Sequence, residues 1–236
     1  MHESHPFHWL DLLNVPEESG HVVMALLVAG ILVLTTAVAR TQLVRQMSTT
    51  EGGLVPDERW TFKNFFEILA ESLFKLTESV IGHHEAPTYF PIIGTIFLFI
   101  FTSNLIGLIP GFLPPTENLN TTLGLGVFVF IYYNYAGFRA HGVAYFKQFM
   151  GPVWWLAPLM FVIEVASHIF RPLSLALRLR GNIMGDHVVL GVFSGLVPYI
   201  LPVIFYGLGV FVAFIQAFVF CLMTMVYISL SISHDH

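Results

Sequence analysis

The residues of this chain that are best suited to chemistry lie in one apolar segment, residues 160–190, MFVIEVASHIFRPLSLALRLRGNIMGDHVVL. On a helix, with about 100° per residue, its polar side chains form a stripe about 120° wide and about 33 Å long. The stripe consists of Glu164, Ser167, Arg171, Ser174, Arg178, Asn182 and Asp186. Most of the remaining residues are Leu, Ile, Val, Phe and Ala. Pro172 and Gly181 are points at which this helix can bend.

The charges of the stripe exclude an orientation toward lipid. One charge at the centre of a bilayer costs about 2.5–3.5 kcal/mol, so Glu164, Arg171, Arg178 and Asp186 together would cost about 10 kcal/mol. They must therefore face protein, water or each other. Two interpretations stay open: ion pairs that hold a helix bundle together, and an aqueous path for ions. Arg180 falls on the opposite side of the helix, where we expect it to reach headgroups or another helix.

A second apolar segment, residues 197–232, adds one strong hydrogen-bonding side chain near its middle, Gln216. Small residues around it let another helix approach closely: Gly207, Gly209, Ala213 and Ala217. Alone, Gln216 can simply hold two helices together. Opposite a stripe that contains Arg178, it is better interpreted as a channel residue.

The whole composition indicates an integral membrane protein. Of 236 residues, 56% are hydrophobic and 11% charged, against about 25% charged in soluble domains. Residues 187–233 contain no Asp, Glu, Lys or Arg, and about 20 apolar residues suffice to cross a bilayer. A water-soluble enzyme is excluded. The net charge of −5 leaves no basic face for nucleic acid, and the single cysteine, Cys221, permits no internal disulfide.

The hydropathy pattern predicts one all-α membrane domain, residues 1–236, with about five crossings. Single spans are expected at 22–39, 89–109 and 121–136, and a long hairpin at 153–196 and 197–232. Residues 60–81 place apolar side chains on one side and Lys63, Glu67, Glu71 and Glu78 largely on the other. That pattern is typical of an amphipathic helix on the membrane surface or against a partner.

The loop charges predict the orientation by the positive-inside rule. The first 20 residues contain acidic but no basic side chains, which also argues against a cleaved signal peptide. They are expected outside, as is the turn with Glu117. The loops with most of the basic residues, 41–87 and 139–151, are expected in the cytoplasm, together with the C-terminus.

The motifs around the stripe resemble those of subunit a of bacterial F-type ATP synthases. The resemblance rests on RPLSLALRL at 171–179, GN at 181–182 and IQAFVF at 215–220, with weaker support from NLIGLIP at 104–110 and from Glu164, fourteen residues before Arg178. It covers residues 89–232 in the family's order and spacing. The first 88 residues fit only in character.

The resemblance implies a proton-translocating stator subunit in the bacterial inner membrane, whose tilted hairpin lies against a ring of c subunits. Arg178 would be the motor arginine, between two offset half-channels. The implied proton pathway comprises Glu164, Ser167, Ser174, Asn182, Asp186, His187 and Gln216. Glu164 and Ser167 would line its cytoplasmic route, and Asn182, Asp186, His187 and Gln216 its outer one. The b subunit of the peripheral stalk and membrane lipid are further implied partners.

The resemblance places ATP synthesis in a separate catalytic head, so this chain would be a non-catalytic subunit. It contains no GxxxxGK[ST] phosphate-binding motif. No cofactor and no metal are expected.

Three positions depart from the family pattern. Arg180 stands where an aromatic residue is common, and Gly209 stands where an ionisable residue is frequent, seven positions before Gln216. Asp186-His187 replaces a small residue followed by one ionisable group. We infer that Asp186 supplies the relay group that is missing at Gly209. The alternative is that Asp186 only pairs with His187 or caps the chain after Gly185.

Two other classes of protein remain as alternatives. A stand-alone ion or proton transporter commonly shows two related halves, and no internal repeat is visible. A membrane metalloenzyme would need ligands close together. The histidines at 2, 5, 8, 83, 84, 234 and 236 are instead dispersed over segments expected on opposite sides of the membrane.

Overall fold

The computed structural model describes residues 16–47, 62–109, 111–142, 145, 156–196 and 200–233. These residues form six α-helices and one 3-10 turn: α1 (Glu17–Met47), α2 (Phe62–Ile81), α3 (Ala86–Gly107), η2 (Pro115–Glu117), α4 (Leu119–His141), α6 (Ala157–Leu196) and α7 (Ile200–Ile232). In these ranges the chain is all-α, as the hydropathy pattern predicts.

Four helices in the described ranges are long and apolar enough to cross a membrane: Ser19–Thr41, Ala86–Gly107, Pro158–Phe193 and Pro202–Ile232. The helix α4 has 23 residues, long enough for a span of about 30 Å. Its apolar residues are interrupted by Asn134 and Arg139, among other polar groups. The predicted crossing at 121–136, and thus a total of five, stays a prediction.

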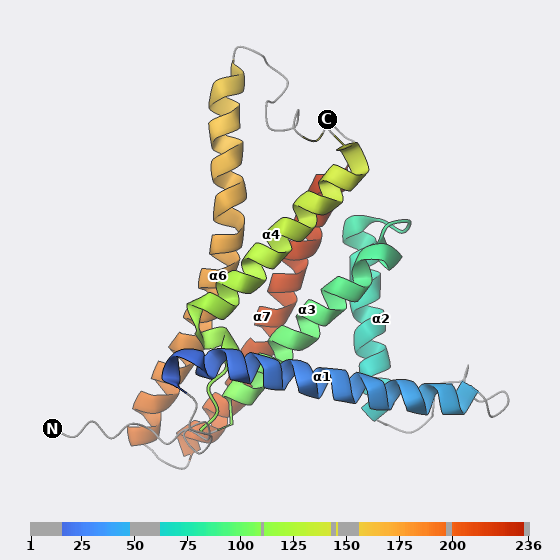
Figure 1. The fold of residues 1–236 in the computed structure, drawn as a ribbon. Helices are drawn as coiled ribbons and strands as arrows, with labels where there is room; N and C mark the ends of the chain where they lie inside the picture. Colours follow the sequence, from blue (N-terminus) through green and yellow to red (C-terminus); the bar gives the residue numbers. More distant parts are fainter. Residues whose placement is uncertain are drawn as a thin grey trace.

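The helices α3, α4, α6 and α7 form the central bundle (Figure 1). The helix α4 packs on α6 and α7, and α3 packs along α7. The largest side chains of their shared core include Phe97, Tyr133, Leu179 and Met225, each with at most 2% of its surface exposed. This core fixes the faces of α6 and α7 that carry polar groups.

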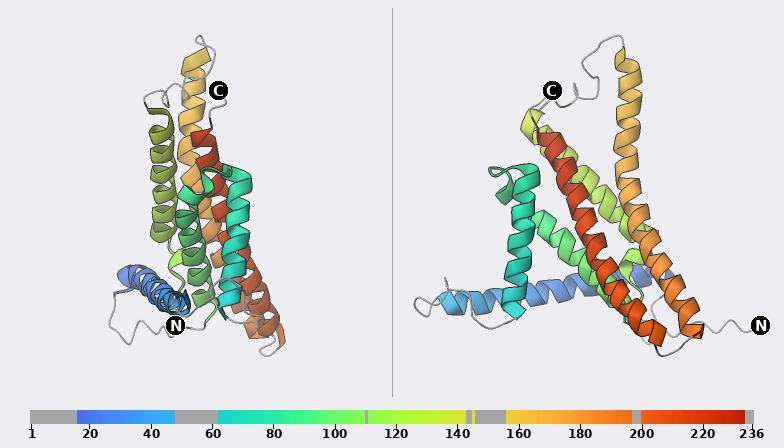
Figure 2. Two further views of the ribbon diagram at one scale, coloured as in Figure 1. Left: turned by 90° about the vertical axis from the view of Figure 1, so that its right-hand side faces the viewer. Right: turned by 180° about the vertical axis from the view of Figure 1, so that it is seen from behind.

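The longest helix of the bundle, α6, is bent. Figure 2 shows that α6 bends part-way along its length, while its first turns stand apart from the other helices. Pro172 lies inside α6, and its missing N–H removes one backbone hydrogen bond at that level. Within the segment predicted at 153–196, residues 157–196 form a single long helix with a proline inside it.

The helix α1 crosses the direction of the bundle and contacts α3, η2 and α4 (Figures 1 and 2). Most of its apolar side chains, including Leu26, Val33 and Leu34, are exposed. An apolar helix with this much open surface is typical of a segment surrounded by lipid.

The helix α2 has the amphipathic character that its sequence predicts. Its side chains Leu73, Thr77 and Ile81 are buried, and it packs on α3 and α7. Glu71 and Lys75 form an exposed ion pair with a 2.8 Å N–O distance. The partner of the apolar face is therefore provided, at least in part, by this chain's own helices.

Candidate functional site: the polar face of α6

The polar stripe of α6 separates into an open middle and two enclosed ends. Ser174, Arg178 and Asn182 are exposed. Glu164, Ser167, Arg171 and Asp186 are partly buried. The two ends therefore meet other elements of the chain, whereas the middle of the stripe faces outward.

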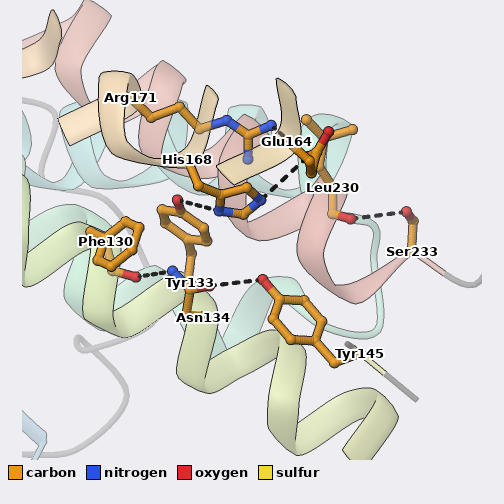
Figure 3. Close-up of polar contacts among 9 residues, drawn as sticks. All are labelled: Phe130, Tyr133, Asn134, Tyr145, Glu164, His168, Arg171, Leu230 and Ser233. Atoms are coloured by element: carbon orange, nitrogen blue, oxygen red, sulfur yellow. Dashed lines mark hydrogen bonds and ion pairs between the residues drawn. The ribbon is translucent and has the colours of Figure 1, made fainter. Parts of the chain in front are cut away.

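The first enclosed end is a cluster of Tyr133, Glu164, His168 and Arg171, which we call the His168 cluster (Figure 3). His168 Nε2 lies 3.3 Å from Glu164 Oε1, and His168 Nδ1 lies 3.0 Å from the hydroxyl of Tyr133 on α4. His168 is 9% exposed, whereas the Glu164 side chain is 33% exposed, so the cluster leads from a partly exposed carboxylate to a buried imidazole within hydrogen-bond reach.

Arg171 is neutralised within the His168 cluster. Its guanidinium lies 3.8 Å from Glu164 Oε1 and 5.2 Å from the centre of the Tyr227 ring on α7. A carboxylate and an aromatic face both stabilise a guanidinium. The first arginine of the stripe is thus occupied by partners from its own chain.

The cluster extends along α4 through neutral groups. Asn134 donates to the carbonyl of Phe130 at 2.7 Å and accepts from the Tyr145 hydroxyl at 3.0 Å. Burial raises the pKa of Tyr145 to about 12, so this hydroxyl stays protonated and donates. Figure 3 shows Asn134 and Tyr145 on the side of α4 next to Tyr133.

The second enclosed end opens into a cavity between α3, α6 and α7, which we call the α6–α7 cavity. Asp186 and His187 of α6, Gly209 and Gln216 of α7, and Asn104 of α3 line it. It is large enough to hold a water molecule. The cavity thus unites polar groups from three helices.

Asn104 brings a polar group to this cavity from α3, outside the stripe. Its Oδ1 accepts a 2.8 Å hydrogen bond from Thr116 of η2. Its buried Nδ2 has no hydrogen-bond partner among the described residues. A buried donor of this kind favours a water molecule in the adjoining cavity.

A further polar group beside the cavity is Glu117, the last residue of η2. Its Oε2 lies 3.3 Å from His187 Nδ1, while His187 Nε2 lies 3.3 Å from the carbonyl oxygen of Gly107. Both side chains are 31% exposed. The pair therefore lies between the cavity and the surface.

Arg178 lies between the two enclosed ends and is exposed, next to exposed Leu177. It forms no ion pair with any residue in the described part of the chain. Arg180 is partly buried, and its Nε has no hydrogen-bond partner within the described ranges. An open guanidinium on an apolar helix needs an anion or water from elsewhere.

The structure brings together only part of the predicted pathway. Asp186, His187 and Gln216 line one cavity, and Glu164 joins the His168 cluster. Ser174 and Asn182 lie on the exposed middle of α6, away from the cavity lining.

Sequence reasoning missed His168, Tyr133 and the pairing of Glu117. His168 follows Glu164 by four residues, the spacing at which helical side chains meet, so the sequence alone is enough to predict this contact. The partners Tyr133 and Glu117 come from elements 35 and 70 residues away, and no local pattern indicates them.

A metal site has no support in the described ranges, where no three His, Cys, Asp or Glu side chains are grouped to hold an ion. His2, His5, His8, His234 and His236 lie outside the described residues.

The apolar helices and the partly buried polar groups define a multi-pass membrane protein that holds several ionisable side chains between its helices. The sequence matches the family model described as "ATP synthase A chain" over residues 20–229. The chain therefore belongs to the ATP synthase subunit a family, a family of ATP synthesis and proton transport.

Curated relatives agree with this family over nearly the full chain. ATP synthase subunit a of Bdellovibrio bacteriovorus is 47% identical over 232 residues, covering 98% of this chain and 99% of the relative. Subunit a 3 of Pelobacter propionicus is 42% identical over 98% of this chain and 99% of its own length. Subunit a of Geobacter sulfurreducens is 49% identical over 174 residues, covering 74% of this chain and 76% of the relative.

Proposed function

We propose that this chain is the stator subunit that conducts protons in an F-type ATP synthase motor and couples their flow to rotation through two offset half-channels. The observation that carries this proposal is the state of Arg178: exposed, unpaired within the described chain, and located between two enclosed polar groups on one helix. A fixed cation at such a position attracts a carboxylate from another subunit.

Arg178 would act on a carboxylate of a rotating c subunit. That carboxylate is neutral in lipid, because ionisation there is costly. Next to Arg178, the positive charge lowers the pKa of the carboxyl group and favours release of its proton. A guanidinium does not titrate at physiological pH, so Arg178 separates the two proton routes instead of carrying protons between them.

The two enclosed ends supply the routes. At about 1.5 Å per residue, Arg178 lies about 21 Å from Glu164 and about 12 Å from Asp186 along α6. Glu164 and Ser167, with the His168 cluster, would serve the cytoplasmic side. Asp186, His187 and Gln216 would serve the outer side through the α6–α7 cavity. Ser174 and Asn182, which are exposed, would face the rotor beside Arg178.

The exposed apolar surface of α6 and α7 supports a membrane-embedded partner. Apart from Ser174, Arg178 and Asn182, the exposed surfaces of α6 and α7 carry many large apolar side chains, among them Leu177, Met184, Leu208 and Phe211, which suits contact with a membrane-embedded ring of c subunits. An upright α1, which crosses the bundle (Figure 2), would leave α6 and α7 tilted in the bilayer. We propose an outer N-terminus, a cytoplasmic C-terminus, and contact with the b subunit of the stalk.

The test is Arg178→Ala, measured by ATP-driven acidification of inverted vesicles, with assembly checked by immunoblot. Arg178 is exposed, so the loss is electrostatic and the complex should still assemble. Pumping should fall at least about a hundredfold, the low end for a group that assists proton transfer. Normal coupled pumping in this variant would reject the motor function.

Arg180→Phe is the matched control, because it removes a neighbouring arginine of the same helix. Arg180 lies on the other side of α6, so most pumping should remain. A stand-alone transporter is the alternative function. The motor subunit must co-purify with a ring of small subunits and a soluble ATPase. Proton movement by this protein alone in vesicles, without those partners, would favour the stand-alone transporter.

A further inference from the structure

We propose that Glu117 and His187 form a two-residue proton relay at the entrance of the α6–α7 cavity, with Glu117 as its outer member. This inference rests on the proposed function, since it requires that the cavity carries protons. It assigns the proton-accepting carboxylate to η2, an element outside the α6–α7 hairpin.

The order of the groups supports a path from surface to interior. His187 lines the cavity together with Asp186 and Gln216, whereas Glu117 does not line it and contacts His187 from outside. Both members of the pair are 31% exposed. A proton that reaches Glu117 is therefore one contact away from the cavity wall.

The contacts of the His187 ring determine how many protons the pair holds. The Gly107 carbonyl can only accept a hydrogen bond, so Nε2 carries a proton. In a neutral ring Nδ1 then carries none. Nδ1 then needs a proton of its own, or one on the Glu117 carboxyl group that faces it at 3.3 Å. Both arrangements are neutral overall, and they differ only in the position of one proton between Oε2 and Nδ1.

Because the two arrangements differ only in the position of one proton, the pair can pass a proton from Glu117 to the cavity. The imidazolium gives its Nδ1 proton to a cavity water or to Asp186 and keeps its Nε2 proton at the Gly107 carbonyl, which leaves the pair with one negative charge, on Glu117. Glu117 then takes a proton from hydronium at the surface. Its O–H bond breaks as the N–H bond at Nδ1 forms, and the pair returns to its first state. One proton enters for each proton that leaves.

A structural role for the pair is less well supported. A partly exposed ion pair contributes about 0–1 kcal/mol. The segment around η2 is already fixed by other contacts: Thr116 donates to Asn104, and a Cβ at Gly107 would lie 2.6 Å from Pro114 Cγ, which shows how closely the loop packs on α3. The loop does not need Glu117 to hold its position.

The test compares Glu117→Gln with Glu117→Asp in ATP-driven acidification of inverted vesicles. Glutamine keeps the size and a hydrogen bond to His187 but cannot carry a proton, so pumping should fall about tenfold or more. Aspartate keeps the acid and should retain most of the activity. The double variant Glu117→Gln with His187→Gln should be no slower than the slower single variant, because both residues serve one step.

Glu85→Gln is the matched control. Glu85 is an exposed glutamate directly before the first residue of α3, at the end of that helix away from the cavity. Its replacement should leave pumping unchanged. Near-normal pumping in Glu117→Gln would overturn the relay, and so would loss of the assembled complex, which indicates a structural tether. Arg178→Ala is measured alongside. If it pumps normally, the motor function itself fails; if it is inactive while Glu117→Gln is normal, only the relay fails.

Discussion

At the scale of single residues, neighbours decide which charge is available to a partner. Arg171 and Arg178 lie two turns apart on one stripe of α6. Arg171 is engaged by Glu164 and by the Tyr227 ring, whereas Arg178 is exposed and has no ion pair within the described chain. Their helical spacing places both arginines on the same stripe. Their surroundings differ: Arg171 binds side chains of its own chain, whereas Arg178 stays available to a partner.

Asp186 of α6 and Gly209 of α7 line the same cavity. We therefore predict that either helix can supply the titratable side chain that the cavity needs. Asp186→Gly should slow ATP-driven proton pumping about tenfold or more, since it removes an acid from the path. Adding Gly209→Glu or Gly209→His should recover part of the rate, because the new group enters the same cavity from α7.

Recovery depends on one neighbour. A Cβ at Gly209 would lie 2.6 Å from Leu108 Cδ2, the far end of a flexible side chain that can turn aside. Gly209→Glu alone, with Asp186 intact, shows whether that shift is tolerated and serves as the control. Near-normal pumping in Asp186→Gly alone would remove Asp186 from the pathway and leave the Glu117–His187 pair as its carrier.

At the scale of elements, the position of the stripe depends on how closely α4 and α6 cross. A Cβ at Gly126 of α4 would lie 2.7 Å from the carbonyl oxygen of Pro172 in α6. Backbone cannot move aside as a flexible side chain does. The absence of a side chain at Gly126 therefore sets the separation of the two helices beside the His168 cluster.

Gly126→Val should consequently destabilise the protein by about 1–3 kcal/mol, the usual cost of overpacking. The measurement is the thermal midpoint of the detergent-solubilised complex together with the amount of assembled complex in membranes. Gly124→Ala, two residues away with nothing within 4 Å of its Cβ, is the control and should match the wild type. Equal stability of both variants would show that α4 and α6 separate without cost.

At the scale of the whole molecule, the arrangement of α1 across the bundle bears on topology. Orientation can be tested by single cysteines, since the natural Cys221 is buried and contributes little background labelling. Cysteines at Glu17 and Glu117 should react with impermeant reagents from outside, and those at Glu51 and Lys147 only from the cytoplasm. Labelling at position 147 from outside would reverse the orientation and exchange the two proton routes.

The sequence by itself determines the class of protein and the chemistry of its main helix. Low charge and long apolar runs require a membrane, and the spacing of Glu164, Arg178 and Asp186 places them on one stripe, because both properties depend only on composition and helical period. The motif around Arg178 indicates the family. None of this depends on how the helices pack.

Only the tertiary structure decides what the stripe meets. It joins His168 to Tyr133, neutralises Arg171, leaves Arg178 open and brings Glu117 to His187. These contacts join residues that lie far apart in the chain, and a helical period carries no information about which loop or neighbouring helix faces a given side chain. Packing of η2 and α4 against α6 supplies that information.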